Sequence, residues 1–410
     1  MSDLVGVAIV GASVAGLHAA EQLRSLGYAG SVTIVGPERH VPYDRPPLSK
    51  GVLLGNADLA DIRLHSEARI AEMALDVRLG VTATGLRGTT VVLDCGEELP
   101  AEYVIIATGL TARRLPGQPD CDSVLTLRGF DDALRIEARL STSRSIAILG
   151  AGLIGGEVAS AARQRGLSVT LIEALNSPMS QSLGPIAGQI LADIYEEAGV
   201  ELRTGTTARA FEADDRSVAL QLSDSSLISA ETVLVAVGGD PATRWLDAGP
   251  SADAHGALCC DAYGRVRGRE RVFAIGDVAA WPDGAGGLYR PGHWASARSK
   301  AAIVAQTITG AGALIPAVPD YAWTDQFGLR IQIVGRPELA DETTLIQSGD
   351  SSPAGTIVGY FHCGRMVAAV LMGTPRDLGR YSRMVSEGEP LAEFTLAGRP
   401  QPMQRRVTLA

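Results

Sequence analysis

The chain has 410 residues, of which 46% are hydrophobic and 20% charged, and its formal net charge is -10. This length exceeds one compact core and predicts two or three domains. The absence of a run rich in lysine or arginine argues against a nucleic-acid partner. The apolar stretch Leu4–Val10 is too short to span a membrane and has no basic segment before it. A cytoplasmic protein without membrane contact is expected.

Five cysteines are present, namely Cys95, Cys121, Cys259, Cys260 and Cys363. They show no CxxC pair and no metal-ligand spacing, so free thiols and no metal site are expected. A strained disulfide between Cys259 and Cys260 is an alternative, but two ordinary thiols are favoured.

The N-terminus predicts a dinucleotide-binding βαβ unit. A buried strand over Val5–Val10 precedes the turn Gly11-Ala-Ser-Val-Ala-Gly16 and a helix over Leu17–Leu26, and the next strand covers Ser31–Val35. Ser13 stands where the pattern G-x-G-x-x-G has the glycine that lets the backbone approach a pyrophosphate. A serine is small enough to fit, and its hydroxyl could help to bind phosphate. The candidate contacts are Gly11, Ser13, Val14, Ala15 and Gly16.

The segment Val41–Lys50 predicts a stiff basic loop. Its prolines exclude regular helix or sheet, and Arg45 and Lys50 bring positive charge beside the first unit. An ordinary surface loop is one reading, but contact with a ligand is favoured. Beyond it we expect a helix over Leu59–Asp76 and short strands over Val77–Leu99. A buried strand then ends in Ala107-Thr108-Gly109, where small residues let a cofactor pass close to the chain.

A second and more complete unit lies in the middle of the chain. A strand over Ser145–Leu149 is followed by Gly150-Ala-Gly-Leu-Ile-Gly-Gly-Glu157, a helix and a strand ending at Glu173. The candidate contacts in its turn are Gly150, Gly152, Leu153, Ile154 and Gly155. An acid about 20 residues after the glycines accepts hydrogen bonds from a ribose 2'-hydroxyl and repels a 2'-phosphate. Because residues 174–178 contain no cation, Glu173 predicts a preference for NADH over NADPH.

The remainder predicts a duplicated fold followed by a further domain. A helix over Gly184–Gly199 and strands within Val200–Leu222 lead to a strand ending at Gly238 and Gly239, which echoes the earlier Ala-Thr-Gly strand. Another strand ends at Gly276 and Asp277. The remaining expected elements are a loop over Pro282–Pro291, a helix over Ala295–Thr309, C-terminal strands at Leu329–Val334, Thr356–His362 and Met366–Leu371, and a mobile tail over Gly398–Ala410.

Two helix N-termini in one chain each offer unpaired N–H groups to a pyrophosphate. They imply two dinucleotides, of which one is a tightly held flavin and the other an exchanging nicotinamide.

These motifs support a family assignment. The chain resembles the FAD-dependent NADH:ferredoxin reductases of bacterial oxygenase and cytochrome P450 systems, the putidaredoxin reductase type. The resemblance covers essentially the whole length and rests on the segments Pro42–Lys50, Ile106–Gly109, Gly150–Glu157, Ala274–Val278 and Trp323–Gln326.

The resemblance implies an α/β fold of the glutathione-reductase type, with two Rossmann-like domains and a C-terminal α+β domain. The expected domains are an FAD part at 1–110 and 240–315, an NAD domain at 111–239, and an interface domain at 316–410. The implied partners are a [2Fe-2S] ferredoxin and NADH, with FAD as the cofactor.

The resemblance also implies roles for single residues. Asp277 would bind the FAD ribitol, Trp294 with the helix start at Ala295 would lie at the pyrimidine end, and Trp323 would cover part of the ring. Lys50 would lie beside the flavin N5 region, near Glu157 on the first helical turn, and these two are the catalytic candidates. The other implied cofactor contacts are Arg45, Val81, Thr108, Gly109, Arg128, Gly238 and Gly276. Because Pro37 stands where some relatives have an acid for the adenosine ribose, Glu38 is assigned that task.

Three rival functions share this scaffold. A disulfide reductase needs a redox-active cysteine pair near the flavin, and an NADH oxidase of this type commonly needs a reactive cysteine at a similar place. Residues 1–94 contain no cysteine, which argues against both of these functions. The third rival is a flavoprotein of the apoptosis-inducing-factor type, whose redox state gates binding to a partner. A nucleic-acid-binding protein of this type would need runs of basic residues, which this sequence lacks.

Overall fold

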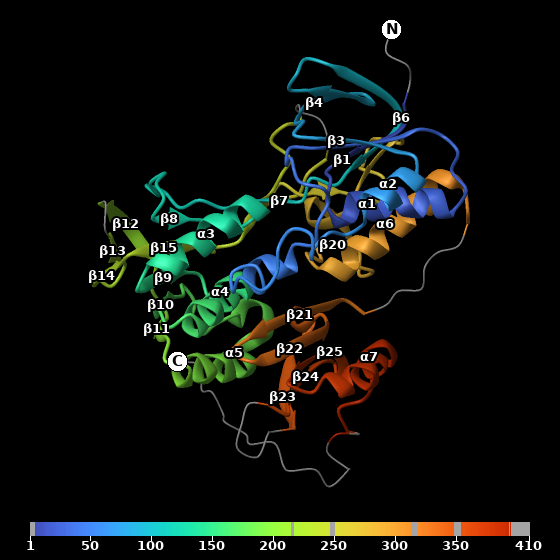
Figure 1. Cartoon of the computed structure of the whole chain (residues 1–410). Coiled ribbons are helices and arrows are strands. Elements are labelled where there is room, and N and C mark those ends of the chain that lie inside the picture. Colours follow the sequence, from blue (N-terminus) through green and yellow to red (C-terminus); the bar gives the residue numbers. More distant parts are fainter. Residues whose placement is uncertain are drawn as a thin grey trace. The chain divides into compact units, whose positions relative to one another are not determined.

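The computed structural model describes residues 5–214, 217–246, 251–312, 319–347, 354–392 and 394. They belong to two compact units (Figure 1). Unit 1 comprises Met1–Pro47, Ala57–Ala112 and Gly239–Ala317, and unit 2 comprises Leu48–Asn56, Arg113–Gly238 and Val318–Ala410. The division at residues 110, 239 and 315 into an FAD part, an NAD domain and an interface domain stays a prediction. The expected tail over 398–410 lies outside the described residues.

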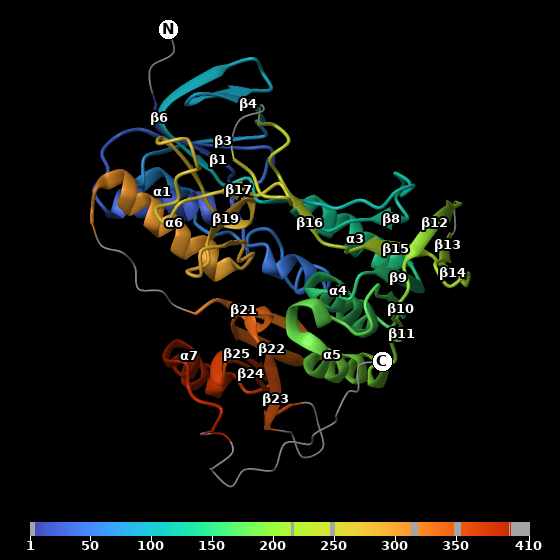
Figure 2. The same cartoon turned by 180° about the vertical axis from the view of Figure 1, so that it is seen from behind.

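Unit 1 is built on a parallel sheet whose strands at residues 5–10 and 32–36 are apolar, as expected where both faces of a sheet are buried. In spatial order the parallel strands are β3 (Leu75–Leu79), β2 (Val32–Gly36), β1 (Val5–Val10), β6 (Glu98–Ile106) and β18 (Val272–Ala274). Helices α1 (Val14–Ser25) and α6 (Trp294–Thr309) lie side by side in both views (Figures 1 and 2). Both contribute to the hydrophobic core under the sheet.

Shorter strands complete unit 1. An antiparallel hairpin of β4 (Ala83–Arg87) and β5 (Thr90–Leu93) extends β6. Strand β7 (Leu110–Ala112) pairs with β16 (Gly239–Pro241). A small sheet contains β17 (Leu258–Cys259), β19 (Ala279–Pro282) and β20 (Leu288–Tyr289), so the expected loop over 282–291 includes a short strand.

The helix expected over Leu59–Asp76 is wrong in most of its length. Only α2 (Glu67–Glu72) is helical, with Ser66 as its N-cap. Upstream, the Asp58 carboxylate accepts the backbone N–H groups of Ala60 and Asp61. Such local side-chain bonds favour turns over helix. Downstream, residue 75 already begins strand β3.

Unit 2 repeats the parallel arrangement. Its strands are, in spatial order, β11 (Glu201–Arg203), β10 (Ser168–Ile172), β9 (Ser145–Leu149), β15 (Thr232–Val235) and β8 (Val124–Leu125). The helices are α3 (Phe130–Thr142), α4 (Leu153–Gln164) and α5 (Ser180–Glu197), and an antiparallel insertion holds β12 (Ala208–Ala213), β13 (Val218–Leu222) and β14 (Leu227–Ala230). The order β3-β2-β1 in unit 1 corresponds to the order β11-β10-β9 in unit 2. This correspondence agrees with the predicted duplication.

Helix α5 begins four residues earlier than expected. Gly184, where the sequence placed the start, has the non-helical angles φ 70° and ψ 178°, and Pro185 follows it. A proline lacks the N–H that continues a helix, so the two parts meet at a kink.

The C-terminal part of unit 2 is an antiparallel sheet. Its strands are, in spatial order, β21 (Tyr321–Gln326), β22 (Leu329–Gly335), β25 (Arg365–Met372), β24 (Thr356–His362) and β23 (Glu342–Gln347). Helix α7 (Leu378–Glu387) packs on it through the buried Tyr381. The three strands expected here are confirmed.

Four single-turn 3₁₀ helices also occur in the described residues, at Pro46–Ser49 (η1), Gly276–Val278 (η2), Pro337–Leu339 (η3) and Pro375–Asp377 (η4). The first corrects the expectation that prolines keep the basic loop free of helix, because proline is tolerated in a first helical turn. Over the described part of the chain, every helix is too short or too polar to cross a membrane.

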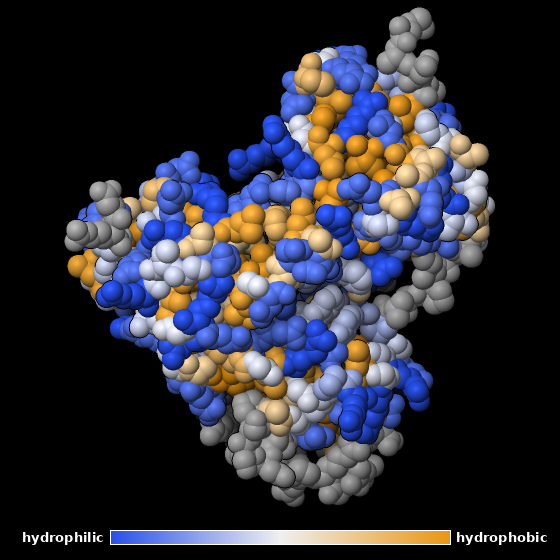
Figure 3. Space-filling view, viewed as in Figure 1, coloured by the Kyte–Doolittle hydropathy of each residue, from blue (hydrophilic) through white to orange (hydrophobic). Residues whose placement is uncertain are grey.

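Large apolar side chains are exposed at scattered positions, and Figure 3 shows apolar and polar groups mixed on the face in view. Two of these exposed residues are Ile154, within the second glycine turn, and Leu175, two residues after Glu173.

Candidate functional site

The first glycine turn lies between β1 and α1 in unit 1. Gly11 has φ 125°, and a Cβ there would lie 2.5 Å from the carbonyl carbon of Ala107 at the end of β6. A Cβ on Gly16 would collide with the carbonyl of Gly11. Both positions therefore require glycine, as a tight dinucleotide turn does. Val14 and Ala15 begin the helix whose N-terminus points into this turn.

Ser13 is the N-cap residue of α1 with an extended backbone. Arg45 donates from Nε to its hydroxyl at 3.5 Å and places a second nitrogen 2.7 Å from Glu38. The Tyr43 hydroxyl donates to the other oxygen of the Glu38 carboxylate. The structure thus brings three predicted contacts, Ser13, Glu38 and Arg45, together beside the turn. The role of Glu38 toward a ribose stays a prediction.

Gly276 and Asp277 lie against the same helix start. A Cβ on Gly276, which has φ 71°, would be 3.2 Å from the Ala15 Cβ. Trp294 is the first residue of α6, and Ala295 follows it. The Trp294 indole donates to an Asp44 carboxylate oxygen at 2.8 Å, and the Arg298 guanidinium lies 4.8 Å from the centre of its ring. This anchors the basic loop to the start of α6.

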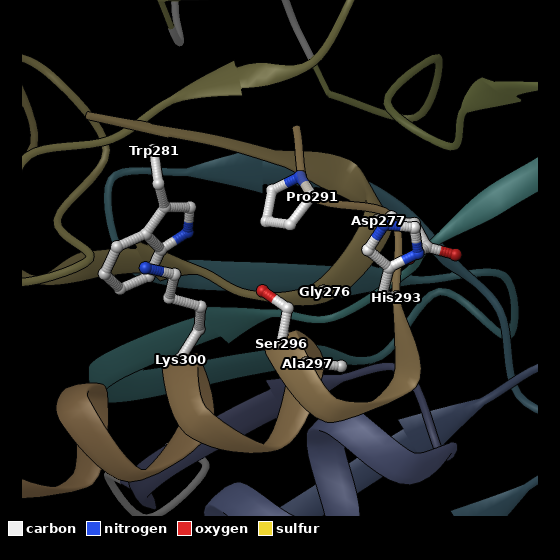
Figure 4. A pocket seen from close by; sticks show the side chains of 9 residues that line it. Gly276, Asp277, Trp281, Pro291, His293, Ser296, Ala297 and Lys300 are labelled. Atoms are coloured by element: carbon white, nitrogen blue, oxygen red, sulfur yellow. The ribbon is translucent and has the colours of Figure 1, made fainter. Parts of the chain in front are cut away.

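A small hollow opens beside Asp277, with about 180 Å³ of empty space including the part open to solvent. Figure 4 shows Ser296 and Lys300 of α6 reaching into it, and the Lys300 ammonium lies 4.6 Å from the Trp281 ring centre. Within the described residues, two buried polar atoms of its lining, Ser296 Oγ and Trp281 Nε1, have no hydrogen-bond partner. Buried polar atoms are normally satisfied, so these two stand out next to Asp277.

Three further predicted contacts stand at carboxyl ends of the same sheet. The Thr108 hydroxyl donates to the Ala242 carbonyl at 2.9 Å, and Gly109, with φ 68°, accepts the Ala242 N–H at 2.9 Å. Val81 donates its N–H to the carbonyl of Gly36 at the end of β2. Ligands of open α/β sheets bind outside these strand ends.

The second glycine turn, in unit 2, has the same construction. Gly150 has φ 101°, and its Cβ would lie 2.5 Å from the Ala236 carbonyl oxygen, while a Cβ on Gly155 would collide with the carbonyl of Gly150. A Cβ on Gly152, the N-cap of α4, would meet nothing within 4 Å among the described residues. This middle position faces open space in front of the helix N-terminus at Leu153. It fits a pyrophosphate.

Glu173 is held against this turn. One carboxylate oxygen accepts the Ala151 N–H at 2.7 Å, and the other accepts the Leu175 N–H at 2.9 Å. The side chains of Leu175, two residues after this acid, and of Ile154, in the first turn of α4, are both exposed. Sequence reasoning found Ile154 but missed Leu175.

Sequence reasoning also missed Arg203. In the parallel register Arg203 of β11 stands opposite Ile172, the residue before Glu173. Its guanidinium lies 2.6 Å from Glu201. The Arg203 carbonyl accepts the Glu173 N–H at 2.7 Å, so the two backbones adjoin, a proximity that only the strand order reveals.

Glu157 forms the other charged centre of unit 2. Its carboxylate is 6% exposed, and one oxygen lies 2.7 Å from the Lys50 ammonium and 2.6 Å from the donating Thr324 hydroxyl. The Ser49 hydroxyl donates to the other oxygen. The expected proximity of Lys50 and Glu157 is confirmed. Glu157 is, however, the fifth residue of α4, beyond the first turn.

Three other predicted residues of unit 2 have defined surroundings. The backbone N–H of Arg128 donates to the Asp132 carboxylate in the first turn of α3. The Gly238 carbonyl accepts the backbone N–H of Arg113 at 3.0 Å. The Trp323 ring stacks on Tyr321, with ring centres 5.7 Å apart. Their roles toward a flavin stay predictions.

All five cysteines are free thiols, so the alternative of a Cys259–Cys260 disulfide is wrong. Burial raises the pKa of the Cys260 thiol to about 12, mainly by desolvation. A protonated thiol is a poor nucleophile.

Comparison with known proteins now identifies the family. Residues 5–301 match the pyridine nucleotide-disulphide oxidoreductases, and residues 321–406 match the reductase C-terminal domain. The chain belongs to the pyridine nucleotide-disulphide oxidoreductase family. Within it, the chain is 35% identical to the ferredoxin reductase component of chlorobenzene dioxygenase from Cupriavidus sp. (strain PS12), with 95% of each chain covered.

Two further members are similar over nearly the whole chain. The ferredoxin–NAD(+) reductase component of the p-cumate 2,3-dioxygenase system of Pseudomonas putida is 32% identical, with 98% of each chain covered. A chain from the covalent putidaredoxin reductase–putidaredoxin complex superposes with a TM-score of 0.87 at 25% identity, with 94% of each chain covered.

Proposed function

We propose that this chain is an NADH-dependent ferredoxin reductase that serves a bacterial dioxygenase or cytochrome P450 system and uses FAD. The ion pair of Lys50 with the buried Glu157 carries the proposal. Lys50 lies in the loop in which a disulfide reductase would need its cysteine pair, and this loop contains no cysteine. The similarity to reductase components of dioxygenase systems over 95% or more of the chain supports the same activity.

FAD fits unit 1. The helix N-terminus at the first glycine turn would hold its pyrophosphate, with Arg45 adding positive charge and Ser13 a hydroxyl. Asp277 would bind the ribitol, and the start of α6 at Trp294 and Ala295 would meet the pyrimidine end. Bound FAD would supply the chemistry that joins a two-electron donor to a one-electron acceptor.

NADH fits unit 2. The backbone N–H groups at the N-terminus of α4, which begins at Leu153, bind its pyrophosphate. Glu173 accepts the hydrogen bond of a ribose 2'-hydroxyl. Lys50 supplies a fixed positive charge for hydride transfer, and Glu157 holds that charge in place. A [2Fe-2S] ferredoxin is the proposed acceptor.

The test is the steady-state reduction of cytochrome c by NADH, with and without added [2Fe-2S] ferredoxins. The proposal predicts that at least one ferredoxin accelerates turnover well above the rate without it. The triple variant Cys95→Ser, Cys121→Ser and Cys363→Ser should keep this rate, because no thiol chemistry is involved. If no ferredoxin accelerates turnover, or if the thiol variant loses the activity, the proposal fails.

A further inference from the structure

Glu157 is the end of a longer chain of buried hydrogen bonds within unit 2. Gln326 donates from its amide nitrogen to the Thr324 hydroxyl at 2.9 Å, and Tyr195 donates to the Gln326 amide oxygen at 2.5 Å. Thr324, Gln326 and Tyr195 are each at most 1% exposed. The route therefore runs from α5 through strand β21 to α4.

Every bond in this chain points the same way. Burial raises the pKa of the Tyr195 phenol, and the nearby Glu157 and Glu173 carboxylates raise it further, so this hydroxyl keeps its proton and donates. Its donation fixes the Gln326 oxygen on the tyrosine side and the amide N–H groups on the threonine side. Thr324 then accepts from Gln326, and its own proton is directed to Glu157.

Gly156 shows that the chain of bonds is built into the fold. A Cβ at this position would lie 2.5 Å from the Tyr195 hydroxyl oxygen and would collide with the Gln326 amide. The dinucleotide fingerprint does not require this additional glycine. Because Gly156 has no side chain, Tyr195 and Gln326 can form their hydrogen bond against α4.

We propose that Tyr195, Gln326 and Thr324 are positioning residues for hydride transfer, which they support by orienting the Glu157 carboxylate and, through it, the Lys50 ammonium. Strand β21 thus contributes to the charged centre beside the NADH-binding turn. This inference rests on the proposed function for its link to hydride transfer, while the chain of bonds is a property of unit 2 alone.

Loss of one donor has a defined consequence. In Tyr195→Phe the Gln326 amide is no longer held and can turn its oxygen toward Thr324. The Thr324 hydroxyl then donates its hydrogen bond to Gln326 instead of to Glu157. The ionised Glu157 carboxylate therefore loses one of its stabilising donors. Thr324→Val removes the same donor directly, whereas Thr324→Ser keeps it.

The first experiment measures flavin reduction by NADH in the FAD-loaded protein by stopped flow between pH 5 and pH 9. Tyr195→Phe and Thr324→Val should lower the maximal rate on the order of tenfold, with the acid limb of the profile moved toward neutral pH, and Thr324→Ser should restore the wild-type profile. Tyr360→Phe is the matched control. Its hydroxyl is also buried in unit 2, but it donates to the Leu183 carbonyl at 2.5 Å.

The second experiment needs no activity. Chemical unfolding of Tyr195→Phe, Glu157→Gln and the double variant should show clear non-additivity of the midpoints, although the two residues share no direct bond. Tyr360→Phe combined with Glu157→Gln should be additive. If the Tyr195 cycle is additive and Tyr195→Phe keeps the wild-type pH profile, the positioning role is wrong. If wild-type protein is not reduced by NADH at all, it is the proposed function that fails.

Discussion

The Lys50 ammonium lies 2.7 Å from an oxygen of the Glu157 carboxylate, which is almost completely buried in α4. An ionised carboxylate is costly to bury unless cations and hydrogen-bond donors surround it. Here Ser49, Lys50 and Thr324 supply these contacts, from a loop and from the C-terminal sheet. The fold therefore maintains a fixed pair of charges in the unit that carries the NADH motif.

Coenzyme preference should depend on Glu173. Glu173→Ala should weaken NADH use and narrow the gap to NADPH, because the variant loses a 2'-hydroxyl acceptor and a repulsive charge. Adding Arg203→Ala should remove part of the gain with NADPH, since the neighbouring strand then has no cation for a 2'-phosphate. The ratio of kcat/KM for the two coenzymes measures both effects. An unchanged ratio in Glu173→Ala, with Glu196→Ala as a surface control, would contradict the assignment.

Gly156→Ala should destabilise the protein by about 1–3 kcal/mol, the usual cost of overpacking a core. The added methyl group would overlap the Gln326 amide and the Tyr195 hydroxyl. Gly379→Ala is the control, because a Cβ there meets nothing within 4 Å among the described residues and the position lies in helix α7. That change should leave stability equal or slightly higher. Urea unfolding measures both, and equal stabilities of the two variants would refute the packing argument.

Retention of the FAD proposed for unit 1 should depend on the bond between Trp294 and Asp44. Trp294→Phe keeps an aromatic ring but removes the donor that ties the basic loop to α6. We expect FAD to dissociate on the order of tenfold more readily, because a hydrogen bond to a charged group contributes about 1.5–3 kcal/mol. Asp44→Asn, which keeps an acceptor oxygen, should lose less FAD than Asp44→Ala. Flavin fluorescence released on dilution is the readout, and equal retention in all variants would argue against this anchor.

Stability should fall at mildly acidic pH because of His18. Burial is the main cause that lowers the pKa of His18 in the folded protein, and the Arg298 guanidinium adds to the effect against the opposing Glu21. The unfolded chain therefore binds a proton at higher pH than the folded protein, and stability is lost as the pH falls from about 6.5 toward the lowered folded value. His18→Gln should flatten this part of the profile in urea unfolding at pH 5 and pH 7.5. A slope equal to that of the wild type would show that other groups cause it.

The glycine turns could be predicted from sequence because their requirement is local. Gly11 and Gly150 both need positive φ and close approach to a neighbouring strand, and such residues stand in a fixed pattern. Glu173 could be predicted for the same reason. The helix expected around residues 59–66 failed because apolar spacing does not reveal that Asp58 would cap turns instead.

Contacts between residues far apart in the sequence could not be predicted from the sequence alone. Arg203 lies next to Glu173 only through the pairing of two parallel strands. Thr324 and Gln326 were visible as parts of a family motif, but their bonds to Glu157 and Tyr195 depend on how β21 packs against α4 and α5. A single sequence has no periodicity that reports such packing.

The central claim is tested most directly by a single-turnover experiment. FAD-loaded protein, reduced anaerobically with one equivalent of NADH, is mixed with an excess of an oxidised [2Fe-2S] ferredoxin. Absorbance then follows the flavin and the cluster separately. The account predicts rapid reduction by NADH but slow reduction by NADPH, followed by two equivalents of reduced ferredoxin for each flavin reoxidised. Equal rates with both coenzymes, or reoxidation that requires oxygen and leaves the ferredoxin oxidised, would contradict it.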